Sequence, residues 1–279
     1  YLYTPNSVVK KAENNKEITI LVIPNNSGGT NDNIKFHAKF ALFQVFLGYL
    51  IFKDLNVVIL EPIFPRTDRN WRIYTHALDR DVLKTEIKKL KRLDLQLENM
   101  VDETIKRFSK KGWKVNNKFL IFGFSASGMF ANRFTLLHPD RVLAASIGSP
   151  GGWPIAPIKS WKGNLLRYPI GISDIDELIG RELELEVYKN VPQLFYLGEE
   201  DKNDSVPHSD SYEHEDAELI NKLFGDNLIE RWEIAEKIYK NMGANVNFKL
   251  YSGIGHRPSL KSIKDTKRLF KKAINEINH

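Results

Sequence analysis

Short apolar runs alternate with longer amphipathic segments along this chain. Runs typical of buried β-strands lie at residues 17–23, 56–61, 118–122, 142–147, 193–197 and 247–251. Apolar side chains recur every three or four positions over residues 93–108, 228–242 and 260–277, and this spacing predicts helices. The alternation of strands and helices predicts an α/β fold, with a mainly parallel sheet that is covered by helices on both faces.

The composition agrees with one large domain. The 279 residues are 42% hydrophobic and 27% charged, which allows a single sizeable core. The absence of cysteine excludes disulfides, a thiol nucleophile and cysteine-ligated metal sites. The net charge of +6 comes mainly from lysine-rich helical stretches whose interleaved apolar residues indicate solvated outer faces. No nucleic-acid motif accompanies this charge, so we expect no nucleic-acid partner, and only weak attraction to anionic surfaces or substrates.

The most apolar helical segment is 40–52. It is shorter than the roughly 20 residues that cross a bilayer, so it predicts a helix buried on the sheet and no membrane span. The sequence opens at Tyr1 without a methionine or a signal peptide, and we expect that an upstream segment was removed or not included. Residues 2–5 predict an edge strand, and the first strands of the sheet are expected to be partly absent. The sequence carries no signal for compartment or oligomeric state.

A serine lies on a sharp turn between a predicted strand and a predicted helix. Residues 123–128 read Gly-Phe-Ser-Ala-Ser-Gly and directly follow the strand 118–122. On such a turn the Ser125 side chain stands clear of the sheet, and the Ala126 N–H points to where a negative charge would develop. The sequence therefore predicts Ser125 as a nucleophile. The alternative is that Ser125 only caps the helix. The pattern departs from G-x-S-x-G, because Ser127 occupies its last position and the glycine follows one step later.

Four acidic residues follow the predicted strand 193–197 in the loop 198–207, and two of them, Glu199 and Glu200, are expected to be solvated. Asp201 comes three residues after Gly198, and we expect its carboxylate to orient a catalytic imidazole. Asp204 remains the main alternative, because the loop is longer than the minimum. An ordinary acidic turn would explain Asp204 equally well.

The candidate base follows the predicted strand 247–251. His256 lies in the glycine-rich loop 252–258, between that strand and the last helix, so its ring can reach the serine. The other six histidines come too early in the chain, lack a preceding strand or end the chain: His37, His76, His138, His208, His214 and His279. The order Ser125, Asp201, His256 therefore predicts a catalytic triad.

These three motifs carry a resemblance to a known family. The segments GFSASG at Ser125, LGEED at Asp201 and GIGH at His256 resemble the α/β-hydrolase superfamily. Within it, the chain is similar to the esterase branch, which includes polyhydroxyalkanoate depolymerases and feruloyl or acetyl esterases. Residues 130–142 also resemble the helix and the start of the next strand in that branch. The resemblance covers most of the chain and implies hydrolysis through an acyl-enzyme, without implying a substrate.

The resemblance also implies an oxyanion hole and a cap. Ala126 N–H would be the first oxyanion donor, and the second would come from the loop 24–29. Relatives often have His-Gly there, whereas this chain has Asn25-Asn26, so either Asn26 or Ser27 is expected to donate; a simple Asn/Gly turn is the alternative. We expect one domain over residues 1–279, with a cap at about 153–190 and a polar excursion at about 202–226.

Several further expectations concern the substrate and its alternatives. Trp153 and Trp161 are expected to border the site of a small-molecule or polymer-linked ester. A peptidase or amidase on the same fold, or a binding protein without turnover, are the competing functions. No cofactor is required by the predicted chemistry. A metal site is the weaker explanation of the acidic and histidine residues between His208 and Asp216, because their spacing matches no known motif and polar loops are usually solvated.

Overall fold

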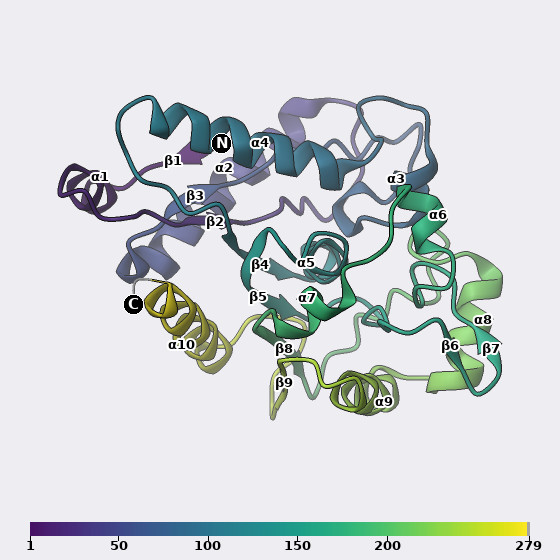
Figure 1. The fold of residues 1–279 in the computed structure, drawn as a ribbon. Helices are drawn as coiled ribbons and strands as arrows, with labels where there is room; N and C mark the ends of the chain where they lie inside the picture. Colours follow the sequence, from purple (N-terminus) through teal and green to yellow (C-terminus); the bar gives the residue numbers. More distant parts are fainter. Residues whose placement is uncertain (278–279) are drawn as a thin grey trace.

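The computed structural model describes residues 1–277, and its centre is a seven-stranded sheet (Figure 1). The strands of this sheet are β1 (Leu2–Tyr3), β2 (Ile20–Val22), β3 (Val58–Leu60), β4 (Phe119–Phe124), β5 (Val142–Gly148), β8 (Gln193–Gly198) and β9 (Val246–Tyr251). Their spatial order is β1-β3-β2-β4-β5-β8-β9, and every neighbouring pair is parallel except β1 with β3. The predicted sheet is therefore confirmed, including an edge strand at its start. A separate hairpin consists of β6 (Ser160–Trp161) and β7 (Asn164–Leu165).

Ten α-helices lie in the described part of the chain. They are α1 (Asn6–Glu13), α2 (Ile34–Phe52), α3 (Arg80–Lys84), α4 (Leu93–Ser109), α5 (Ala126–Leu137), α6 (Ile175–Ile179), α7 (Leu185–Asn190), α8 (His214–Phe224), α9 (Leu228–Asn241) and α10 (Leu260–Glu276). Two short 3-10 turns are η1 (Lys53–Leu55) and η2 (Thr75–Ala77). The three helices that the apolar spacing predicts coincide with α4, α9 and α10.

Helices cover both faces of the sheet, as predicted. On one face α4, α5 and α9 contribute to a core that includes Leu97, Phe134 and Tyr239. On the other face α2 and α10 pack over β2, β3 and β4. The Phe52 ring of α2 lies 5.1 Å from the Phe122 ring of β4 and 6.1 Å from the Phe270 ring of α10.

Helix α2 is longer and more exposed than predicted. It runs over 19 residues, and its sheet-facing stripe consists of His37, Ala41, Val45, Gly48 and Phe52. The prediction of a buried helix was wrong for the opposite side, where large apolar side chains face solvent. One stripe of an α-helix reaches the sheet, so an almost wholly apolar helix leaves its other side uncovered. The segment Ile34–Leu55 is the one described helix long and apolar enough to cross a bilayer, a weak indication by length and composition alone.

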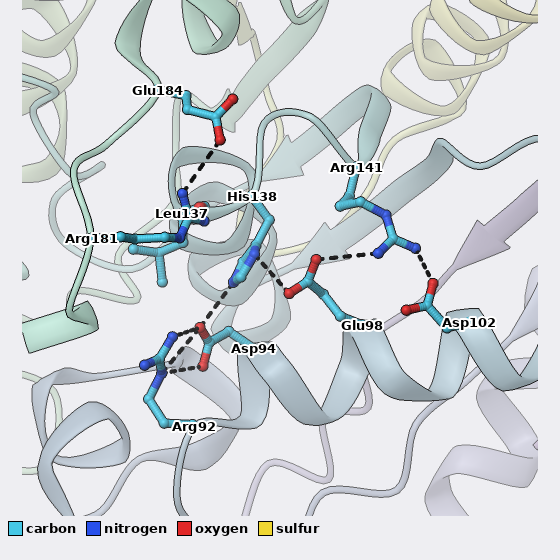
Figure 2. A network of polar contacts seen from close by, with 9 residues as sticks. All are labelled: Arg92, Asp94, Glu98, Asp102, Leu137, His138, Arg141, Arg181 and Glu184. Carbon is cyan, nitrogen blue, oxygen red and sulfur yellow. Dashed lines mark hydrogen bonds and ion pairs between the residues drawn. The ribbon is translucent and has the colours of Figure 1, made fainter.

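A buried ionic cluster lies at the end of α5 remote from Ser125 (Figure 2). His138 contacts Asp94 at 2.9 Å and Glu98 at 3.0 Å, and Arg92 binds Asp94 from the other side at 2.8 Å. Burial alone would raise the pKa of Asp94, but the hydrogen bonds from His138 and Arg92 lower that pKa to about 2. Burial alone would lower the pKa of His138, but the two carboxylates raise it above its ordinary value. The cluster is thus structural, because α5 separates it from Ser125 by about 18 Å.

This cluster predicts a pH-dependent stability. A raised folded pKa means that His138 stabilises the fold fully below its unfolded pKa of about 6.5 and loses that contribution as pH rises through the folded value. Asp94 contributes above its unfolded pKa of about 3.9 and loses that contribution as pH falls toward about 2. We expect His138→Gln to lower the free energy of unfolding by about 1.5–3 kcal/mol near pH 6 and by less near pH 9.

Urea unfolding at both pH values measures this effect. His214→Gln is the matched control, because the His214 side chain is exposed and lies 3.7 Å from Glu218. We expect the control to change stability by less than about 0.5 kcal/mol. An equal loss for His138→Gln at both pH values would contradict the proposed charge on His138.

Candidate active site

Ser125 sits on a strained turn between β4 and α5. Its backbone has φ 62° and ψ −127°, a conformation that residues other than glycine rarely adopt. Such strain costs on the order of 1–3 kcal/mol and persists where the surrounding structure enforces it. Here the Ser125 N–H donates to Gly148 O at the end of β5, at 2.9 Å, and the Ser125 carbonyl accepts from Met129 N–H at 3.0 Å. The turn is therefore held from both sides.

Two glycines and a serine make this turn sterically feasible. A Cβ on Gly123 would lie 2.0 Å from Ser127 O, and one on Gly128 would lie 2.4 Å from Gly148 O. Because both obstacles are backbone atoms, only glycine fits at either position. The Ser127 hydroxyl donates to Phe124 O at 2.9 Å and accepts from Phe124 N–H at 3.0 Å. A glycine at position 127 could not form these two hydrogen bonds. The serine is therefore accommodated there because its hydroxyl stabilises the turn.

The structure brings Asp201 and His256 together. The His256 Nδ1 atom lies 2.9 Å from Asp201 Oδ2 and 3.0 Å from Oδ1. The Asp201 side chain is 1% exposed, whereas the imidazole is 26% exposed. Burial alone would raise the pKa of Asp201, but the hydrogen bonds from His256 and from Asn203 N–H lower it below its ordinary value. An ionised carboxylate beside Nδ1 keeps the Nε2 side of the ring available for proton transfer.

The loops that carry these two residues are tied to each other. Glu199 N–H donates to Tyr251 O at 3.0 Å, and Glu200 N–H donates to Ile254 O at 2.9 Å. A Cβ on Gly198 would lie 2.2 Å from Ile254 O, so β8 must end in glycine where the two loops cross. This contact fixes the position of Asp201 relative to His256.

Asp204 has a different partner. Its Oδ2 atom binds the buried Arg231 guanidinium at 2.7 Å, and its Oδ1 atom accepts from Val206 N–H at 3.0 Å. Both carboxylate oxygens are therefore engaged away from His256. Of the two acids that the sequence offers, only Asp201 contacts the imidazole.

The imidazole lies beside the turn that carries Ser125. The His256 ring is 4.8 Å from the Phe124 ring, and Phe124 directly precedes Ser125 in the chain. Ser125, Asp201 and His256 also follow β4, β8 and β9 respectively, so all three lie at the carboxyl edge of parallel strands. Within residues 1–277, the Ser125 hydroxyl makes no hydrogen bond with the ring. Hydrogen bonds between a nucleophile and its base are often long until a substrate is bound.

The residues predicted to supply oxyanion donors differ in their surroundings. Ala126 is the first residue of α5, so its N–H has no partner within the helix and is directed away from the helix end. Asn26 lies on the same pocket as Ser125, but its N–H donates to the Gln44 side chain at 3.1 Å. Ser27 does not line the pocket, and its hydroxyl bonds to Gly29 O at 3.0 Å and to His37 at 2.9 Å.

The loop that carries Asn26 is anchored by a buried asparagine. Asn25 accepts from Phe64 N–H at 2.9 Å and donates to Phe64 O at 3.1 Å. His76 also bonds to Phe64 O, at 3.0 Å, and burial lowers the pKa of His76 to about 3, so this ring is neutral. The loop after β2 is thereby fixed against the loop after β3.

A cavity of about 310 Å³ opens beside Ser125 and Ala126. Most of the other residues in its wall are polar: Asn26, Arg66, Tyr74, Asn203, Ser205, His208, Asp210 and Ser211. Gly28, Met129 and Gly151 complete the wall. Within this wall, Arg66 forms an ion pair with Asp210 and lies 3.8 Å above the Tyr74 ring. The segment 203–211 supplies much of the wall, whereas the expected cap at 153–190 supplies none of it. Five of these residues, Asn203, Ser205, His208, Asp210 and Ser211, lie in the polar excursion predicted at about 202–226, whereas no sequence signal indicates Arg66 or Tyr74.

The two tryptophans predicted to border the substrate lie elsewhere, so this prediction was wrong. Trp153 is 1% exposed and stacks on Phe224 of α8 at 3.9 Å, and its Nε1–H donates to Ile170 O at 2.9 Å. Trp161 packs against the same apolar cluster from the β6–β7 hairpin. An aromatic side chain buries more apolar area in a separate small core than at a polar pocket. Both tryptophans pack into such a core.

Two acidic residues of the polar segment between His208 and Asp216 form ion pairs. Asp210 binds Arg66, and Asp216 binds Arg167 at 2.6 Å. Among residues 1–277, no three His, Asp or Glu side chains gather closely enough to hold a metal ion. His279, which the sequence argument set aside as a base, lies outside the described residues.

Comparison with known proteins identifies the fold. No protein-family model and no curated protein matches the sequence. Among solved structures, the chain is similar to poly(aspartic acid) hydrolase-1 from Sphingomonas sp. KT-1, at 18% identity and a TM-score of 0.58, over 92% of this chain and 87% of that one. It is also similar to a thermostable esterase, at 11% identity and a TM-score of 0.50, over 99% of this chain and 57% of that one.

These similarities and the sheet show the fold of the chain. The chain has the α/β-hydrolase fold, as the three sequence motifs predicted. At such low identity the neighbours show the fold alone, so the activity must be argued from the residues of this chain.

Proposed function

We propose that this protein is a serine hydrolase that cleaves carboxylic esters through an acyl-enzyme on Ser125. The observation that carries the proposal is the 2.9 Å contact between His256 Nδ1 and the buried Asp201 carboxylate, on a ring that lies against the residue before Ser125. A histidine oriented by a buried acid beside a serine on a strained turn is the arrangement that activates a hydroxyl.

The reaction follows from these positions. His256 Nε2 accepts the Ser125 proton as the hydroxyl oxygen attacks the acyl carbon, and Asp201 stabilises the resulting imidazolium. Ala126 N–H donates to the oxyanion of the tetrahedral intermediate. Asn26 N–H is the second donor if the substrate displaces the Gln44 oxygen that now accepts from it. The imidazolium protonates the leaving alcohol, and the ring then activates a water molecule that releases the acid.

Amide cleavage is the second candidate. The neighbour from Sphingomonas is named as a hydrolase of poly(aspartic acid), a polymer linked by amide bonds, and its similarity has the higher TM-score of the two. Arg66 and His208 in the wall of the pocket offer donors for a polar or anionic chain. The ester remains the first proposal because its leaving alkoxide needs less assistance from a general acid than an amine does.

Activity assays separate these proposals. The purified chain should hydrolyse short p-nitrophenyl esters with kcat/KM at least about 100-fold above that for the matched p-nitroanilides, and a fluorophosphonate should label Ser125. Comparable efficiency on the anilides would favour an amidase. A lack of labelling at Ser125 would leave a binding protein that has the fold without turnover.

The polar wall predicts a preference for short acyl groups. A long alkyl chain would desolvate Arg66, Asp210 and their neighbours without replacing their hydrogen bonds. We expect kcat/KM for p-nitrophenyl acetate or butyrate to exceed that for the decanoate by at least about tenfold. Initial rates across the acyl series, below the micelle-forming concentration of each ester, measure this preference. Higher efficiency on the decanoate would contradict it.

A further inference from the structure

Between its first and last turns, helix α2 presents large side chains to solvent and small ones to the sheet. Ala41, Val45 and Gly48 face inward, where a Cβ on Gly48 would lie 2.5 Å from Ile23. Leu42, Phe43 and Phe46 on the outer side are 55%, 59% and 57% exposed. An ordinary surface helix has the opposite distribution, with polar residues outside.

The exposed residues form one continuous strip along the helix. The strip consists of Phe40, Leu42, Phe43, Phe46, Leu47 and Leu50. Tyr49 extends it toward β1, since its ring lies 5.0 Å from that of the exposed Tyr3. Gln44 is the only amide or charged side chain between residues 40 and 52, and it is turned toward Asn26. Apolar surface of this extent marks a site of interaction with another apolar phase.

The charges around the strip are almost all positive. Helix α2 carries Lys35 and Lys39 and no acidic residue. Helix α10 covers the same face of the sheet and carries six cationic and two acidic residues. The two helices are joined where Lys267 and Lys271 both bind Asp54, each at 2.9 Å, just after the end of α2. Figure 1 shows α10, in yellow, next to the last turns of α2. An apolar strip therefore lies beside a cationic helix.

We propose that this face binds the surface of a membrane that contains anionic lipid. The strip of α2 inserts among the acyl chains near the headgroups, and the cations of α10 lie over the lipid phosphates, as in helices that lie in the plane of an interface. The helix lies on the bilayer and does not cross it, because its other side packs on the sheet. The proposal concerns attachment and does not depend on the reaction at Ser125.

A second copy of the chain fits this face less well. A second copy would add the same excess of positive charge, from Lys35, Lys39 and α10, to this face. The acidic residues nearby are engaged, because Asp54 binds two lysines and Asp265 binds Lys249 at 2.7 Å. Like charges at an interface oppose association, whereas an anionic lipid surface complements them.

Vesicle sedimentation tests the proposal. The chain should bind vesicles of phosphatidylcholine and phosphatidylglycerol in equal parts, and bind phosphatidylcholine alone at least about tenfold more weakly at low salt. The double variant Phe43→Ser, Phe46→Ser should weaken binding to the mixed vesicles at least about tenfold. Lys264→Gln should weaken it about fivefold at low salt and have little effect at high salt.

Matched measurements keep the result interpretable. Leu165→Ser removes an apolar side chain on β7 that is 72% exposed, more than Phe43 or Phe46, and should leave binding unchanged. Circular dichroism and thermal unfolding check that each variant is folded. The proposal is overturned if the wild type does not bind the mixed vesicles, or if the double variant binds as tightly as the wild type. It is also overturned if sedimentation without lipid shows a wild-type dimer that the double variant abolishes, because a second copy then covers the face.

Discussion

Replacement of Ser125 by alanine is expected to lower kcat for ester hydrolysis by about 10⁴- to 10⁶-fold. Without the hydroxyl no acyl-enzyme can form, and only the oxyanion donors remain to assist attack by water. The variant should also lose labelling by fluorophosphonate. The stability of the variant should stay the same or rise. Alanine keeps the positive φ at position 125, so the backbone strain remains. Initial rates with p-nitrophenyl acetate, together with thermal unfolding, measure both effects.

Ser252→Ala is the matched control for this experiment. Ser252 is an exposed serine at the start of the loop that carries His256, and it takes no part in the proposed reaction. We expect its kcat to stay within about twofold of the wild type. Ester hydrolysis by Ser125→Ala at more than a tenth of the wild-type rate would show that another residue is the nucleophile.

A pair of aspartate variants separates the catalytic acid from its neighbour. Asp201→Asn removes the charge that stabilises the imidazolium and favours the wrong tautomer of His256, so kcat should fall by about 10⁴-fold. Asp204→Asn should lower kcat by less than about tenfold, because both of its oxygens are bound elsewhere. It should instead lower the free energy of unfolding by about 1.5–3 kcal/mol, because Arg231 loses a charged partner in a buried position.

We therefore expect Asp201→Asn to act mainly on kcat and Asp204→Asn to act mainly on the free energy of unfolding. A larger loss of kcat in Asp204→Asn than in Asp201→Asn would reverse the assignment of the acid. Glu200→Gln serves as a further control, because this exposed residue in the same loop should affect neither quantity.

The sequence predicts most of the fold because the central strands of the sheet are buried on both faces and appear as unbroken apolar runs. The edge strand β9 is partly exposed, and its alternation of polar and apolar residues predicts it instead. Every predicted strand coincides with a strand of the sheet. The residues that follow β4, β8 and β9 could also be predicted, since parallel strands place their carboxyl ends on one edge. The choice between Asp201 and Asp204 required the structure, because it depends on which carboxylate the loop after β9 meets.

The wall of the cavity could not be predicted either, because it depends on contacts between residues that are distant in the sequence. Arg66 and Asp210 are 144 residues apart in the chain, and neither lies in a motif. Trp153 was misplaced because a tryptophan in an irregular segment fits a substrate site and a satellite core equally well by composition alone. The outer side of α2 was misjudged because its apolar residues surround the helix and their spacing does not indicate which side meets the sheet.

The close contact of the two loops at Gly198 restricts which residues can replace this glycine. Any side chain at position 198 would push against Ile254 O and displace the segment that presents the base, although Gly198 itself touches no reacting atom. A saturation library should therefore tolerate only glycine there, while the exposed neighbours Glu199 and Glu200 accept many replacements. Homologues that have lost this glycine would be expected to have lost turnover as well, even where all three members of the triad persist.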